Sequence, residues 1–185
     1  MKQEIEKSIE VLEDGKLLLY PTDTVWGLGC DATNAEAVKK VYKLKNRVES
    51  KSLVILVESL EMLNDYIQEM PAEALRLLNS LEKATTIIYD HKKGLADNMI
   101  AADNTIAVRI PNHEFCKQLI AEFGKPIVST SANKSGESTP KSFSEIDNAI
   151  IEGVDYIVDL EREKVSLKSS TILKLVGDEV VVIRP

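Results

Sequence analysis

Apolar residues along the chain follow two different spacings, which alternate from one segment to the next. Ile5, Ile9 and Leu12 fall on one face of a helix that Gly15 ends, and the apolar run 17–20 that follows is typical of a buried strand. Further strands are predicted at 53–57, 85–89, 105–110, 127–130, 171–176 and 179–183. The helices between them are predicted to begin close to Asn34, Ser59, Pro71, Asn112 and Ser142, which are typical residues for a cap or a first turn.

The connections between these elements indicate the type of sheet. Most predicted strands are separated by a helix, whereas the last two are separated only by Gly177 and Asp178, a typical hairpin turn. Both kinds of connection together predict an α/β fold with a mixed, parallel and antiparallel sheet flanked by helices. With 185 residues, the chain can bury one substantial core but hardly two, so we expect a single domain over 1–185.

Composition and charge exclude several classes of protein. No apolar run is long enough for a signal core or a membrane span, so we expect a cytoplasmic protein that does not insert into membranes. Cys30 and Cys116 are far apart and only two histidines accompany them, which argues against a zinc cluster or a disulfide framework. A formal net charge of −7 argues against a surface that binds nucleic acid over its whole area, although a local basic cleft is compatible with it.

Candidate chemistry lies where polar residues interrupt the apolar runs, because neither GxxxxGK[ST] nor GxGxxG occurs in the chain. These segments are 21–24, 45–47, 129–133 and Arg184, and most of them follow a predicted strand, where α/β sheets commonly bind ligands. Each also has an ordinary structural explanation. Segment 21–24 could be a turn, 45–47 a solvated helix end and 129–133 a polar loop. Arg184, and likewise Arg109, could be a surface arginine whose stem covers the sheet.

Taken together, six segments resemble one known family. PTDTVWGLGCDA, YKLKNRVESKSLVILV, AVRIPNH, IVSTSANKSGESTP, SSTILKL and VIRP are similar, in this order, to segments of the YrdC-type threonylcarbamoyl-AMP synthases. The similarity covers nearly all of the chain from Leu17 to Pro185, and its end at Pro185 is typical of the short bacterial form. One departure is Ser52, which stands where the family usually has proline.

The resemblance implies a YrdC-like fold: a twisted, largely open sheet with a concave cationic cleft. It also implies roles for particular residues. The catalytic residues would be those of the K-x-R and S-x-N motifs, Lys45, Arg47, Ser131 and Asn133. The nucleotide would be bound by these four residues together with Ser129 and Arg184. The other substrates would contact Thr22, Thr24, Trp26, Arg109 and Ser170, with Trp26 in a position that is commonly tyrosine.

The activity implied is that of a nucleotidyltransferase. It would form threonylcarbamoyl-AMP and pyrophosphate from L-threonine, bicarbonate or CO2, and ATP, for N6-threonylcarbamoyladenosine modification of tRNA. Mg²⁺ would arrive with ATP rather than in a protein metal site, because Asp23 is the only acid within the core motifs and is interpreted as the cap of its turn. The expected partners are the downstream threonylcarbamoyl-transferase proteins, with direct contact to tRNA or double-stranded RNA also possible.

Two alternative functions stay open at this stage. A tRNA-binding or double-stranded RNA-binding module would use the same basic cleft, although the acidic net charge weighs against tight binding. A carbamoyl-transfer domain of the hydrogenase-maturation type would share the fold, although this chain has no C-x-x-C motif of the kind that accompanies such domains.

Overall fold

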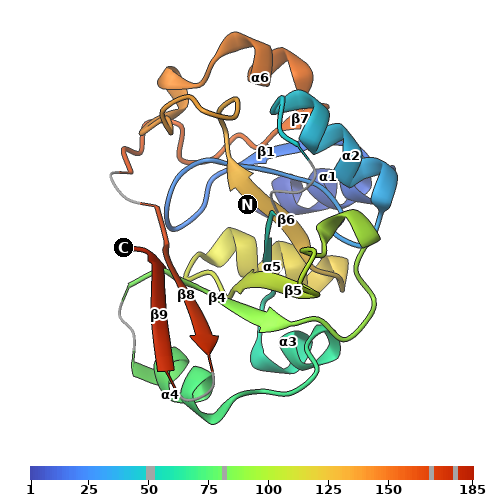
Figure 1. Ribbon diagram of the computed structural model, residues 1–185. Helices are drawn as coiled ribbons and strands as arrows, with labels where there is room; N and C mark the ends of the chain where they lie inside the picture. Colours follow the sequence, from blue (N-terminus) through green and yellow to red (C-terminus); the bar gives the residue numbers. More distant parts are fainter. Residues whose placement is uncertain (49–52, 81–82, 167–168, 177–178) are drawn as a thin grey trace.

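One mixed sheet organises the computed structural model, which describes residues 1–48, 53–80, 83–166, 169–176 and 179–185 (Figure 1). Across the described residues its strand order is β7-β1-β2-β6-β3-β5-β4-β8-β9. The strands are β1 (Leu18–Tyr20), β2 (Gly27–Gly29), β3 (Val54–Leu56), β4 (Thr85–Asp90), β5 (Thr105–Arg109), β6 (Ile127–Ser131), β7 (Tyr156–Ile157), β8 (Thr171–Val176) and β9 (Glu179–Arg184).

The pairing of these strands confirms the predicted mixed α/β sheet. β1 with β7, β3 with β5, and β4 with β8 are parallel pairs, whereas the other neighbours, including the β8 and β9 hairpin, are antiparallel. The hairpin prediction is confirmed for its two strands, and its turn at Gly177 and Asp178 lies outside the described residues. β2 and β7 were not predicted. β2 has glycine at two of its three positions, which is atypical of a strand, and β7 has only two residues.

The helices are α1 (Lys2–Glu13), α2 (Ala35–Leu44), α3 (Leu60–Tyr66), α4 (Ala72–Ser80), α5 (Glu114–Phe123) and α6 (Asn148–Gly153), with 3-10 turns η1 (Asp97–Met99) and η2 (Phe143–Glu145). Asn34 and Ser59 cap α2 and α3 as predicted, since their side-chain oxygens accept backbone N–H groups of the first turn. Within the described part of the chain, no helix has the length and apolar character that a bilayer crossing requires.

At two predicted helix starts, the expected capping residues do not cap the helix. The helix expected at Asn112 begins at Glu114, and the Asn112 amide instead donates to the Asp23 carboxylate. The capping box expected from Ser142 and Glu145 does not form, because the Glu145 carboxylate accepts the Lys141 N–H. Asp147, whose side chain accepts the Ala149 N–H, caps the helix that follows.

Helices pack on both faces of the sheet. α2, α3 and α4 pack on one face, in a cluster that includes Ile55 and Val128. α1 and α5 pack on the other face, in a cluster that includes the next residue of β3, Leu56, and the preceding residue of β6, Ile127. The period of two along β3 and β6 thus supplies both layers, which is why these central strands are apolar on successive residues.

Three neighbouring strands, β1, β2 and β6, approach one another closely at Tyr20 and Gly29. The fully buried Tyr20 side chain of β1 crosses β2, and its hydroxyl donates to the Val128 carbonyl of β6 at 2.8 Å. Gly29 of β2 lies under the ring, where a β-carbon would overlap the Val128 carbonyl oxygen and would lie 2.9 Å from the Tyr20 ring. Glycine is therefore required at this position for steric reasons rather than for its backbone angles.

We predict that Gly29→Ala lowers the free energy of unfolding by about 2 kcal/mol or more, because the methyl group must displace either Tyr20 or the β6 backbone. Urea unfolding followed by circular dichroism measures the change. Ser144→Ala, which alters an exposed side chain, is the control and should shift stability by less than about 0.5 kcal/mol. An unchanged midpoint for Gly29→Ala would contradict the steric requirement.

Candidate functional site

A cavity of about 280 Å³ lies on one face of the sheet. Alternation along β5 places Ile106 and Val108 in the core and Ala107 and Arg109 at the cavity. Most residues predicted for the site line it: Thr24, Trp26, Arg47, Arg109, Ser129, Ser131, Ser170 and Arg184. Residues from seven strands and from loops far apart in the sequence therefore meet at one site.

Arg109 is the most buried of the three arginines in the cavity wall. Its Nη1 donates to Asp23 Oδ1 at 2.6 Å, with side-chain exposures of 4% and 11%. The second oxygen of Asp23 accepts the Asn112 amide at 3.0 Å. Asp23 therefore joins the loop after β1 to the end of β5, and its interpretation as a turn cap is wrong. The possibility that Arg109 is a surface cation is likewise excluded.

Arg184 ends β9 and points to the segment before β8. Its guanidinium donates twice to the Ser170 carbonyl, at 2.7 and 3.1 Å, and the Ser170 hydroxyl bonds with that of Thr86 at 2.8 Å. Burial lowers the pKa of Arg184, and the charge of Arg109 lowers it further. Two cations that repel each other across one cavity favour an anion between them.

Arg47 enters the cavity from the segment after α2. It is half-buried, and burial lowers the pKa of its guanidinium. Among the described lining residues there is no aspartate or glutamate. Three arginines are present, together with four serines of β6 and of the segment before β8, and with Thr24 and Thr130. The lining thus combines positive charge with neutral hydroxyl donors, which is a combination suited to phosphate or carboxylate oxygens.

Some residues of the loop 21–26 stabilise the loop itself, and others line the cavity. Thr22 does not line the cavity: its Oγ1 accepts the Thr24 amide at 3.0 Å and donates to the Val25 carbonyl at 2.8 Å, which holds the turn. Thr24 and Trp26 line the cavity, and the Trp26 ring packs on Phe143 with centroids 5.0 Å apart. The loop is therefore held in place by contacts within the protein.

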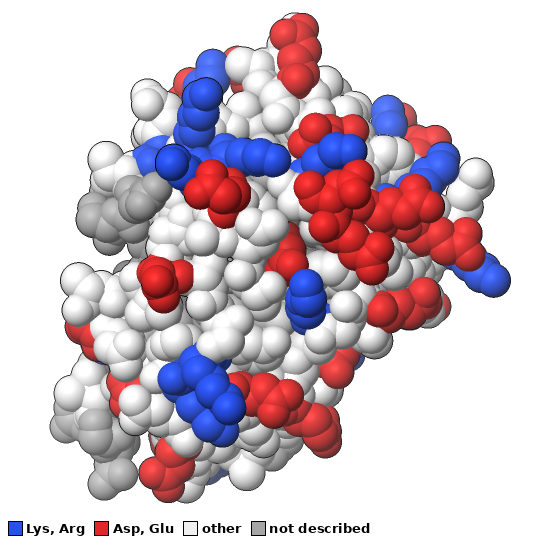
Figure 2. Space-filling view, turned by 90° about the vertical axis from the view of Figure 1, so that its right-hand side faces the viewer, with Lys and Arg blue, Asp and Glu red and all other residues white. Residues whose placement is uncertain are grey.

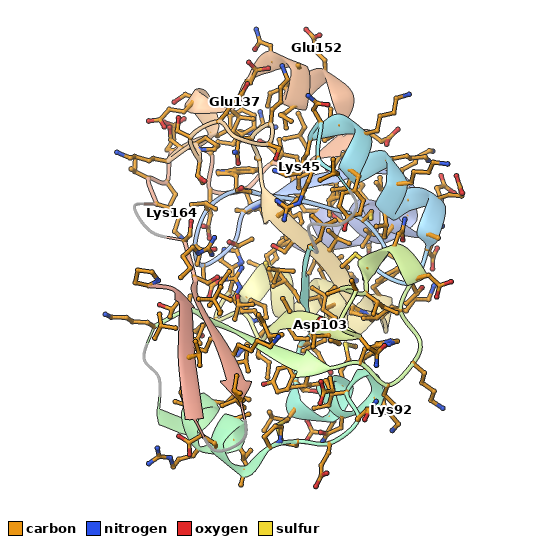
Figure 3. The ribbon with its side chains drawn as sticks, viewed as in Figure 1. Lys45, Lys92, Asp103, Glu137, Glu152 and Lys164 are labelled. Carbon is orange, nitrogen blue, oxygen red and sulfur yellow. The ribbon has the colours of Figure 1, made fainter. Side chains whose placement is uncertain are left out.

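Lys45 is also outside the cavity lining. Its side chain extends from the end of α2 toward β6 (Figure 3), where Nζ donates to the carbonyls of Ser131 and Asn133 at 2.5 and 2.6 Å. Only 2% of the residue is exposed, and burial lowers the pKa of its ammonium to about 8, with the charge of Arg47 acting in the same direction. A solvated helix end is excluded for Lys45, because the amine fixes the backbone of the 131–133 segment.

Asn133 supports the same segment from within. Its Nδ2 donates to the carbonyls of Lys134 and Glu137, and its buried Oδ1 has no partner among the described residues. Lys45 and Asn133 thus hold the loop whose Ser131 faces the cavity. Ser52, the departure from the family pattern, lies outside the described residues.

Sequence reasoning missed two kinds of residue at the site. The first is the apolar floor of Val54, Ile88, Ala107 and Ile172, which no polar motif marks. The second is Asp23 as the partner of Arg109. The two residues are 86 positions apart, and they meet only because the loop after β1 reaches the end of β5. The three-arginine arrangement likewise depends on strand order.

Charge outside the cavity is mixed. On the face shown in Figure 2, acidic and basic side chains are interspersed and neither sign covers the surface. Across the residues that the structure describes, no group of three or more His, Cys, Asp and Glu side chains is placed to hold a metal ion. Among the described residues, the arginines and hydroxyl groups of the cavity wall are therefore the best candidates for ligand binding.

Comparison with known proteins identifies the class. Residues 10–185 match the family model of Sua5, YciO and YrdC proteins, which carries the description "Telomere recombination". The chain therefore belongs to the Sua5/YciO/YrdC family, and the resemblance found in its motifs is confirmed.

Individual relatives are similar over most of the chain. Two curated relatives are named threonylcarbamoyl-AMP synthase. The protein of Pseudoalteromonas translucida is 36% identical over 84% of this chain and 84% of its own, and that of Saccharophagus degradans is 38% identical over 75% and 73%. A crystal structure of P. abyssi Sua5 complexed with L-threonine superposes with a TM-score of 0.90 at 28% identity. This chain is covered completely in that superposition and spans 54% of the P. abyssi chain.

We predict that the buried Lys45 ammonium makes stability rise with pH in the ligand-free protein. A pKa of about 8 in the folded state lies below the value of about 10.4 in an unfolded chain, so the folded state binds fewer protons between these values. From about pH 7.5 to about pH 9.5, the free energy of unfolding should rise by about 2 kcal/mol more in the wild type than in Lys45→Met. Urea unfolding at several pH values measures this, and parallel profiles for the two proteins would contradict it.

Proposed function

We propose that this chain is an L-threonylcarbamoyladenylate synthase that forms threonylcarbamoyl-AMP and pyrophosphate from L-threonine, bicarbonate or CO2, and ATP. The observation that carries the proposal is the cavity wall of three arginines without a described acidic residue. Such a wall suits a reaction that brings anionic reactants together. The names of the curated relatives and the threonine complex of P. abyssi Sua5 support the same activity.

The reaction consists of two bond-forming steps. The threonine amine, in its unprotonated form, adds to CO2 and loses a proton to give a carbamate, which is an anion. A carbamate oxygen then attacks the α-phosphorus of ATP, the bond from that phosphorus to the β-phosphate oxygen breaks, and pyrophosphate leaves. Because AMP is transferred to the carbamate oxygen, the enzyme is a nucleotidyltransferase. The nucleophile is already negative, so the protein's main tasks are to position the reactants and to compensate their charge.

The arginines are assigned to those tasks. Arg47 offers a planar pair of donors to the phosphate or carbamate oxygens, and Ser129 and Ser131 offer neutral donors beside it. Arg184 is assigned to the nucleotide, and its repulsion from Arg109 is relieved by the bound anion. Arg109, Thr24, Trp26 and Ser170 are assigned to threonine and its carbamate, with Thr22 supporting the loop.

Lys45 and Asn133 would both support the site by keeping the 131–133 backbone in place. Lys45 would have a second role, because its ammonium retains one N–H beyond the two carbonyls that it contacts. A phosphate oxygen that reaches this N–H would receive a charge-assisted hydrogen bond. Mg²⁺ would enter with ATP, and its ligands would be the phosphate oxygens and water.

The product is unstable and would pass in the cytoplasm to a downstream threonylcarbamoyl-transferase that modifies tRNA. The RNA-binding alternative is less favoured, because the formal net charge of −7 weighs against tight binding of a polyanion. The hydrogenase-type carbamoyl-transfer alternative is less favoured because the matching curated relatives carry the synthase name.

We predict that pyrophosphate release from ATP requires L-threonine and bicarbonate together, since neither compound alone contains the carbamate nucleophile. A coupled pyrophosphate assay with each compound omitted in turn measures this, and mass spectrometry identifies the adenylate. Release at an equal rate with ATP alone would show a simple ATP hydrolase instead.

We also predict that Arg47→Ala lowers turnover by roughly a hundredfold or more while the protein stays folded. Arg47→Lys should recover only part of this loss, because the charge returns without the two-pronged geometry. Arg76→Ala is the matched control: Arg76 lies on the surface and pairs with Glu73, so turnover should not change. Near-normal turnover in Arg47→Ala would remove Arg47 from the charge-compensating wall.

A further inference from the structure

A second cavity, of about 320 Å³, is lined in part by Asp23, whose ion-pair partner Arg109 lines the first cavity. We propose that it is a binding site for a small organic anion that carries a carboxylate or phosphate on an apolar body. The proposal goes beyond the function proposed above and does not depend on it. Its evidence is the combination of apolar floor, unpaired ammonium groups and compensated acid in one cavity.

The floor comes from three elements that meet beside the sheet. Leu60 begins α3, Leu78 belongs to α4, and Ile110 follows β5, and all three are partly buried against the first core cluster. Pro111 is buried beside them. These side chains leave apolar surface facing the cavity, and a ligand with a hydrocarbon body would remove that surface from water.

The rim carries positive charge. Lys83, just before β4, and Lys117, in the first turns of α5, line the cavity, and both are exposed. Within the described residues neither ammonium has an ion-pair partner, so both charges are available at the cavity. In a chain with a formal net charge of −7, two unpaired lysines at one cavity favour an anion.

The only acid in the described wall does not cancel this charge. Asp23 is engaged by Arg109 through Oδ1 and by the Asn112 amide through Oδ2. A cation in the cavity would therefore meet two lysines and a carboxylate that is already compensated. Inorganic phosphate would leave the apolar floor exposed, and a neutral hydrocarbon would leave the ammonium groups unused, so the two features together select an amphipathic anion.

The test is calorimetric titration of the full chain with 3-phenylpropanoate, without ATP or threonine. We expect a dissociation constant of about 1 mM or lower. Acetate, which lacks the apolar body, and 3-phenylpropanamide, which lacks the charge, should each bind at least about tenfold more weakly. Phenyl phosphate tests whether the site also accepts a phosphate head group.

Variants place the ligand in one cavity or the other. Lys117→Ala should weaken binding roughly fivefold, and the double variant Lys83→Ala with Lys117→Ala should weaken it further. Lys92→Ala alters an exposed lysine elsewhere (Figure 3) and should leave the affinity unchanged. Arg47→Ala, which alters the first cavity, should also leave it unchanged.

Three results would overturn the proposal: no binding of 3-phenylpropanoate at millimolar concentration, full affinity in the double lysine variant, or loss of binding in Arg47→Ala. The last result would show that the ligand occupies the first cavity. Both lysines are exposed, so the variants should fold, and a thermal melt of each verifies this. Because no turnover is measured, failure here leaves the synthase proposal untouched.

Discussion

The ion pair of Asp23 and Arg109 is the interaction on which the site depends. Both side chains are nearly buried, so the loss of either partner would leave an uncompensated charge, at a cost of about 3 to 5 kcal/mol. The pair connects the loop after β1 with the end of β5, and its second carboxylate oxygen holds the segment that leads into α5. Three separate parts of the chain are thus fixed by one carboxylate.

This arrangement also explains the charge of the first cavity. Asp23 is directed away from the cavity lining, whereas its partner Arg109 faces the cavity together with Arg47 and Arg184. The structure therefore compensates one arginine from behind and leaves the ligand side without a described carboxylate. The mutual repulsion of Arg109 and Arg184, together with the neighbouring hydroxyl groups, makes the site electrostatically suited to an anion.

Two motif residues have a structural task in addition to any chemical one. Lys45 and Asn133 bind backbone carbonyls around the 131–137 segment, so they shape the loop from which Ser131 reaches the cavity. The hydrogen bonds to the two carbonyls hold the Lys45 ammonium in place, and its burial lowers its pKa. Support of the loop and binding of phosphate are compatible roles, because an ammonium group has three donors.

The sequence by itself determined the α/β class, most strands, the capped starts of α2 and α3, and the family, because these follow from local periodicity and from ordered motifs. It also indicated most of the polar residues that line the cavity. Only the tertiary structure decided that Thr22, Lys45 and Asn133 stand behind the lining, that Asp23 pairs with Arg109, and that α5 begins at Glu114. These outcomes depend on which loops and strands the fold brings together. β2 and β7 carry no local signal, because β2 has glycine at two of its three positions and β7 has only two residues.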